Sequence, residues 1–124
     1  MKQVINSSQA PAAVGPYSQA IAIDNLVFTS GQIAVVEGKL MEGSVEDQAH
    51  QVMKNLQAVL QAAELDFNQV IKTTIFLTDM ADFTVINKVY DSYLAQPYPA
   101  RETVAVKQLP LGANVEISMI ASKN

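Results

Sequence analysis

The feature that most constrains the fold is the run from Val70 to Leu77, which is dense in β-branched residues. This composition favours a β-strand, along which successive side chains alternate between two faces. The apolar residues fall in both alternating sets, with Val70 and Phe76 in one and Ile71, Ile75 and Leu77 in the other. We therefore expect a strand that is buried on both of its faces.

Two helices are predicted on either side of this strand in the sequence. Ser44 followed by Asp47 is typical of a helix N-cap with an acidic residue in the first turn. Apolar residues then recur at spacings of three and four as far as Ala63, which indicates one packing face. His50 falls on the polar side of this helix, and we interpret it as a solvated surface residue. A second helix is expected over residues 79–94.

The remaining segments predict strands and turns. Strands are expected at residues 2–6, 18–23, 26–30, 101–107 and 114–122. Asp24 and Asn25 suit a tight hairpin between the second and third of these predicted segments, and Pro110 and Gly112 suit a turn joining the last two. The order is therefore strand pairs, helix, strand, helix, strand pair. This predicts an α+β fold with two helices packed on one face of a sheet.

Two helices cover only one face of such a sheet. Because strands 70–77 and 114–122 are apolar on both sides, we expect other copies of the chain to cover the second face. Patterning alone thus predicts an oligomer.

Length, charge and composition exclude several classes of function. The 124 residues suit one domain, residues 1–124, and the 49% hydrophobic content supplies a core. A net charge of -4 argues against nucleic acid as a partner. The chain has no cysteine and one histidine, so no metal site is expected. No segment approaches about 18 uninterrupted apolar residues, so we expect no membrane partner and a cytoplasmic location.

Arg101 is the only arginine in a chain that otherwise uses seven lysines for positive charge. It opens the predicted strand 101–107 after an apolar approach, where an unpaired charge is costly. There are two interpretations of a guanidinium at this position. It binds a carboxylate or phosphate of a ligand through two parallel hydrogen bonds, or it forms an internal salt bridge. These residues alone leave both readings open.

Glu116 is the only acid embedded in the apolar run of the last strand. If the last two strands pair as antiparallel neighbours, Arg101 and Glu116 can lie on the same face of the sheet. Glu102, next to Arg101, should then point to the opposite face. A carboxylate in a partly apolar pocket is a candidate for proton transfer, and a structural bridge between Arg101 and Glu116 is the alternative.

Several sequence blocks together resemble one family, the RidA (YjgF) family of reactive-intermediate deaminases. The matching blocks are Ala10–Tyr17, Thr29–Ile33, Lys72–Asp82, Pro99–Arg101 and Val115–Ile117. The resemblance implies a chorismate-mutase-like fold and a homotrimer with a central β-barrel, whose active sites lie in clefts between subunits. It also implies hydrolysis of 2-imino acids and their enamine tautomers, chiefly 2-iminobutanoate and 2-iminopropanoate, to 2-keto acids and ammonia without a cofactor.

The resemblance also implies roles for individual residues. Glu116 would activate the attacking water, and the substrate would be bound by Arg101, Tyr17, Ser30, Gly31, Asn87 and Thr103. The chain departs from the family pattern at Thr103, where cysteine is frequent, at Ala34, where proline is frequent, and at Glu102, where a small residue is usual. Two other functions remain open: a non-catalytic ligand-binding or regulatory role, and the ribonuclease-like inhibition of translation attributed to some relatives.

Overall fold

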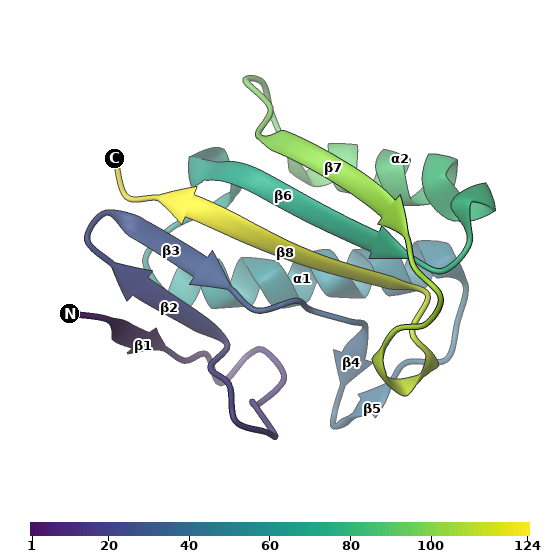
Figure 1. Cartoon of the computed structure of the whole chain (residues 1–124), viewed down its shortest axis with the longest axis horizontal. Helices are drawn as coiled ribbons and strands as arrows, with labels where there is room; N and C mark the ends of the chain where they lie inside the picture. The colour runs from purple at the N-terminus through teal and green to yellow at the C-terminus, as the bar shows by residue number, and fades with distance from the viewer.

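The computed structural model describes residues 1–124 and contains a six-stranded mixed sheet with the strand order β1-β2-β3-β8-β6-β7 (Figure 1). Its strands are β1 (Gln3–Ile5), β2 (Ala20–Ile23), β3 (Leu26–Thr29), β6 (Val70–Leu77), β7 (Ala100–Ala105) and β8 (Val115–Ser122). A separate two-stranded hairpin is formed by β4 (Val35–Val36) and β5 (Lys39–Leu40), and the helices are α1 (Val45–Ala62) and α2 (Phe83–Tyr93). Neither helix is long and apolar enough to cross a membrane.

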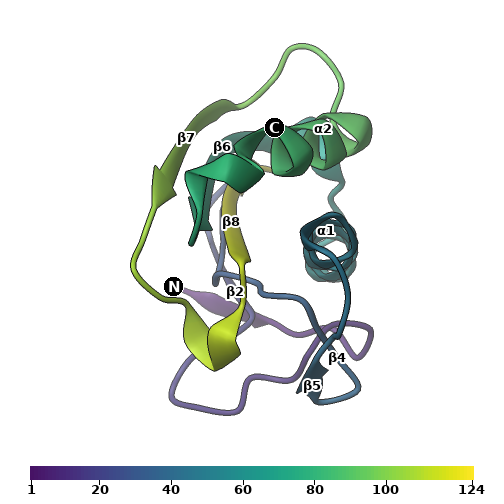
Figure 2. The same cartoon turned by 90° about the vertical axis from the view of Figure 1, so that its right-hand side faces the viewer.

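Both helices lie on the same face of the sheet, which confirms the predicted α+β arrangement (Figure 2). Between the helices and the sheet lies a hydrophobic core of 23 buried residues. Along β8 every second side chain is buried in this core, and the residues between them are only partly covered. The apolar faces of α1 and β8 therefore hold the two layers together.

Local sequence signals place α1 and the β2–β3 hairpin as expected. The Ser44 hydroxyl caps α1 by accepting a hydrogen bond from the Asp47 backbone N–H at 3.1 Å. Ile23 pairs with Leu26 across the hairpin turn.

The solvated surface position expected for His50 is wrong, because its ring is partly buried and its Nδ1 lies 2.8 Å from the Tyr93 hydroxyl of α2. This contact depends on helix packing, which the periodicity of α1 alone does not show.

Within one chain, β6 is buried on one face rather than on both. Thr73, Ile75 and Leu77 face the helices and are buried, whereas the alternating side chains are only partly covered. A β-bulge between Val70 and Lys72 moves Val70 to the buried face and leaves Ile71 exposed. The alternation assumed from the sequence therefore breaks at the start of the strand.

The last two strands are not neighbours, contrary to the expectation of a terminal strand pair. β6 lies between them, parallel to β7 and antiparallel to β8. The β6–α2–β7 segment is a crossover unit, in which a helix returns the chain to the start of a parallel strand. The connection from β7 to β8 is too long for a tight hairpin, and it contains the predicted turn at Pro110–Gly112.

Candidate active site

Arg101 lies on β7, the edge strand of the sheet, with its side chain on the face that carries the helices. Its backbone pairs with that of Thr73 on β6. The guanidinium donates a hydrogen bond to Asn87 Oδ1 on α2. Its carbon also lies 5.2 Å from the ring centre of Tyr90 and 5.9 Å from that of Phe83. The Asn87 amide and the rings of Phe83 and Tyr90 thus hold the guanidinium in place.

No carboxylate in the chain pairs with Arg101. The single ion pair is between Lys72 Nζ and Glu102 Oε1, at 3.3 Å. Glu102 lies on the face opposite to Arg101, as alternation along the strand predicts. The internal Arg101–Glu116 salt bridge left open by the sequence is therefore wrong for this chain, and the guanidinium keeps donors free for a ligand.

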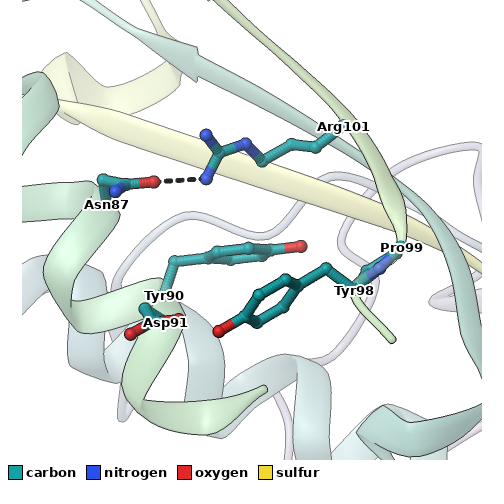
Figure 3. A pocket seen from close by; sticks show the side chains of 6 residues that line it. All are labelled: Asn87, Tyr90, Asp91, Tyr98, Pro99 and Arg101. Atoms are coloured by element: carbon teal, nitrogen blue, oxygen red, sulfur yellow. Dashed lines mark hydrogen bonds between the residues drawn. The ribbon is translucent and has the colours of Figure 1, made fainter. Parts of the chain in front are cut away.

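The guanidinium borders a pocket of about 380 Å³ between α2 and β7 (Figure 3). We call this the arginine pocket; its lining residues are Asn87, Tyr90, Asp91, Tyr98, Pro99 and Arg101. Tyr98 points toward Asp91, whose hydrogen bond and negative charge raise the pKa of the Tyr98 phenol. The lining holds one cation, Arg101, and one anion, Asp91, so the pocket suits a small charged ligand better than an apolar one.

Glu116 lies on β8 with its carboxyl group against Gly31. A Cβ added at Gly31 would come within 2.6 Å of Glu116 Oε2, so only glycine permits this approach without displacing the carboxylate. Partial burial raises the pKa of the Glu116 carboxyl above its usual value. A carboxylate with a raised pKa is a better base than one on the open surface.

A second pocket, of about 480 Å³, lies beside Gly31 and is mainly apolar. We call this the Tyr17 pocket; it is lined by Pro11, Ala12, Val14, Tyr17, Gly31, Gln32, Ile33, Val35, Gly38, Pro110 and Leu111. Ser30 sits next to it, and its hydroxyl donates to the Ser18 carbonyl at 2.6 Å. This bond ties the end of β3 to the segment that follows Tyr17.

The residues singled out in the sequence therefore form two groups on one chain. Arg101 and Asn87 meet at the arginine pocket, and Tyr17, Gly31 and Glu116 meet near the other one. Arg101 pairs with Thr73 on the helix-covered face, whereas Glu116 pairs with Phe76, whose side chain lies on the opposite face. The expectation that Arg101 and Glu116 share a face is wrong, because it assumed that β7 and β8 are neighbours.

Thr103 lies two residues beyond Arg101 on the same face of β7. Its hydroxyl oxygen is buried and has no hydrogen-bond partner. Buried hydroxyl groups nearly always have a partner, so the Thr103 hydroxyl has hydrogen-bonding capacity that this chain alone does not use.

The sequence gives no site role to four members of the arginine pocket, which are Tyr90, Asp91, Tyr98 and Pro99. Tyr90 follows Asn87 by three positions, a spacing that places both on one side of a helix and could have indicated a shared site. No three His, Asp or Glu side chains gather closely enough to hold a metal ion.

Known proteins are similar to this chain over nearly its whole length. A family model described as Endoribonuclease L-PSP matches residues 7–123. Reactive Intermediate Deaminase A, chloroplastic, of Arabidopsis thaliana is 49% identical over 98% of the chain, which spans 66% of that protein. The mouse 2-iminobutanoate/2-iminopropanoate deaminase is 45% identical, over 98% of the chain and 91% of the relative.

The chain belongs to the RidA (YjgF) family.

Solved structures support this membership at the level of the fold. A Thermotoga maritima protein described as a putative endoribonuclease superposes with a TM-score of 0.96 at 41% identity, over 100% of this chain and 99% of its own. Escherichia coli TdcF, solved with bound serine, has a TM-score of 0.92 at 40% identity, with 98% and 99% covered. Relatives that are 41%, 45% and 49% identical to this chain are named deaminases. Others, at 44% and 46% identity, are named only as RutC family proteins, and some matches carry endoribonuclease descriptions.

Proposed function

We propose that this RidA-family chain hydrolyses 2-imino acids and their enamine tautomers to 2-keto acids and ammonia, with no cofactor. The substrates in view are 2-iminobutanoate and 2-iminopropanoate, the compounds named for the mouse and human relatives. The observation that carries the proposal is the Arg101 guanidinium, which borders a pocket and has no carboxylate partner in the chain.

In this proposal Arg101 binds the substrate carboxylate through two parallel N–H donors. Asn87 accepts one other N–H of the guanidinium and so sets its orientation. Fixing the carboxylate also fixes the imine carbon, which is directly bonded to it. Holding a reactant in this way lowers the entropic cost of the chemical step.

Glu116 acts as the general base. Water adds its oxygen to the carbon of the protonated imine and gives a proton to the Glu116 carboxylate, which leaves a neutral tetrahedral carbinolamine. Glu116 returns this proton to the nitrogen, the C–N bond breaks and ammonia departs. The hydroxyl group gives its proton back to Glu116 as the carbonyl group of the 2-keto acid forms, and ammonia carries that proton away. The raised pKa of Glu116 favours this role, because a base acts best when its pKa lies near the working pH.

The two groups of residues act together when chains assemble. We propose a homotrimer with its sites between subunits, in which Arg101, Asn87 and Thr103 of one copy face Tyr17, Ser30, Gly31 and Glu116 of another. The opposite placement of Arg101 and Glu116 within one chain supports this arrangement. So does the incompletely covered second face of β6 and β8.

The clamp role of Arg101 is tested by ligand binding and melting. Arg101→Lys keeps the charge but loses the planar fork, so the affinity for 2-ketobutyrate should fall about tenfold or more. Arg101→Ala should change the melting temperature of ligand-free protein little, because only aromatic contacts and one hydrogen bond are lost. Added 2-ketobutyrate should raise the melting temperature of the parent and not of Arg101→Ala.

Lys88→Ala is the matched control, because it removes an exposed cation of α2 next to Asn87 without touching the pocket. It should respond to 2-ketobutyrate as the parent does. If the keto acid stabilises Arg101→Ala as much as the parent, carboxylate recognition lies elsewhere and the clamp role is wrong.

The endoribonuclease description of the family model favours RNA cleavage as a second candidate. The net charge of -4 and the pI near 4.7 count against it, since RNA binding normally relies on basic side chains. Incubation with single-stranded RNA, with Glu116→Gln as a control for contaminating nuclease, separates the two. Cleavage by the parent that Glu116→Gln abolishes would favour this second function.

A further inference from the structure

A buried contact connects the arginine pocket to the interior of the sheet. The Tyr90 hydroxyl donates a hydrogen bond to Thr73 Oγ1 at 2.9 Å. Thr73 is completely buried and Tyr90 is 5% exposed, so water does not compete for this bond. Neither residue figures in the proposed chemistry, yet each places a hydroxyl group in the interior, where an unpaired polar group is costly.

Both residues of this hydrogen bond lie next to Arg101. Thr73 is the direct pairing partner of Arg101 across β6 and β7, so the two side chains start from adjacent points on the same face. The face of the Tyr90 ring is presented to the guanidinium, with 5.2 Å between the ring centre and the Arg101 carbon. In Figure 3 the ring lies beside Arg101 and below its bond to Asn87. The three residues form a triangle of one backbone pair, one hydrogen bond and one cation–π contact.

The tilt of the Tyr90 ring determines the position of the Arg101 guanidinium. Without a fixed hydroxyl, a tyrosine ring at the edge of a pocket can tilt, and the attraction of a cation to its face falls as the ring turns away. Desolvation by burial raises the pKa of Tyr90, more than the Thr73 bond and the charge of Arg101 lower it. The phenol therefore remains a hydrogen-bond donor at neutral pH.

We propose that Thr73 is a positioning residue for the arginine pocket: its hydroxyl holds the Tyr90 ring, and the ring holds the Arg101 guanidinium ready to bind a carboxylate. The inference deepens the proposed function and rests on Arg101 as the carboxylate clamp. It extends the site to a buried residue on β6 that does not line the arginine pocket.

Three substitutions isolate the hydrogen bond. Thr73→Val keeps the shape and loses the acceptor, Tyr90→Phe keeps the ring and loses the donor, and Thr73→Ser keeps the hydroxyl. We expect the dissociation constant of 2-ketobutyrate and the KM for the imine to rise about fivefold to tenfold in Thr73→Val, the loss typical of one neutral hydrogen bond. The kcat should stay within about twofold of the parent, because the chemical step is untouched.

The other variants test the coupling. Tyr90→Phe should behave like Thr73→Val, and the double variant should be no worse than either alone, since both remove the same bond. Thr73→Ser should restore most of the affinity. A purely structural role would lower the melting temperature in Thr73→Val and leave the dissociation constant unchanged, which would overturn the proposal.

A second readout does not depend on the reaction. Arg101 is the only arginine, so its labelled Nε–H group gives a single arginine side-chain signal in NMR. Relaxation of this signal should show a more mobile guanidinium in Thr73→Val than in the parent or in Thr73→Ser. Thr74→Val, on the opposite face of β6, is the matched control and should leave the signal unchanged.

This readout separates the two proposals. A mobile Arg101 in Thr73→Val, together with a parent that binds no keto acid, would support the positioning role and contradict the proposed function. An equally ordered Arg101 in the parent and in Thr73→Val would overturn the positioning role, whatever the parent binds.

Discussion

At the scale of single residues, the candidate site combines a cation without a partner and a carboxyl group with a raised pKa. Arg101 was predicted because it is the only arginine, and Glu116 because it interrupts an apolar strand. Both signals are local and visible in the sequence. Thr73 and Tyr90 gave no such signal, because a threonine in a β-rich run and a tyrosine on the apolar face of a helix are ordinary core residues.

The raised pKa of Glu116 makes a prediction for stability as a function of pH. Because burial raises the folded-state pKa above the unfolded value, folding favours the protonated form. Below the unfolded pKa, Glu116 is neutral in both states and carries no charge penalty. As the pH rises through the folded pKa, the parent must hold a partly buried charge that Glu116→Gln does not.

Glu116→Gln should therefore gain stability relative to the parent between acid and neutral pH, with the gain levelling off above the folded pKa. The same variant should lose about a hundredfold or more in turnover. Denaturant unfolding of both proteins across this pH range measures the difference. Glu102→Gln, which removes an exposed carboxylate from an ion pair, should show no such gain; a difference that does not change with pH would contradict the account of Glu116.

At the scale of the elements, local signals predicted the structure better than long-range pairing did. The Ser44 cap and the β2–β3 hairpin depend on residues close in the sequence and were found as expected. The pairing of β7 depends on α2, which carries the chain across to the far side of β6. The alternation of apolar and polar residues shows which face of a strand is buried, but it does not show which strands are neighbours. The predicted β7–β8 pair is therefore wrong.

The contact between the segment after β3 and β8 supplies a prediction at this scale. Gln32 and Ile117 exchange both backbone hydrogen bonds, which places Gly31 against Glu116. Gly31→Ala adds a Cβ where the carboxylate now lies, and the flexible Glu116 side chain must move. We expect turnover to fall at least tenfold, with a smaller loss of 2-ketobutyrate binding, because the Arg101 clamp is unchanged. Gly112→Ala is a control for glycine replacement at a site with open space, where the positive φ of 74° makes alanine strained without touching Glu116 or the two pockets. A Gly31→Ala variant with parental turnover would show that Glu116 does not need its present position.

At the scale of the whole molecule, one chain holds two incomplete groups of site residues on opposite faces of its sheet. The proposed trimer joins Arg101 of one copy with Glu116 of another, so each complete site needs two chains. A chain with Arg101→Ala still offers an intact Glu116, and a chain with Glu116→Gln still offers an intact Arg101. Two inactive variants should therefore complement each other when they are refolded together.

The most direct test of this account is the rate of 2-ketobutyrate release from threonine in a coupled assay with a threonine dehydratase. The parent should accelerate release, and each single variant should fail to do so. Random mixing of the two variants should restore about a quarter of the parental acceleration, because half of the arginines and half of the glutamates that meet are intact. A parent that gives no acceleration would contradict the deaminase function, and a mixture that stays inactive beside an active parent would contradict a site shared between subunits.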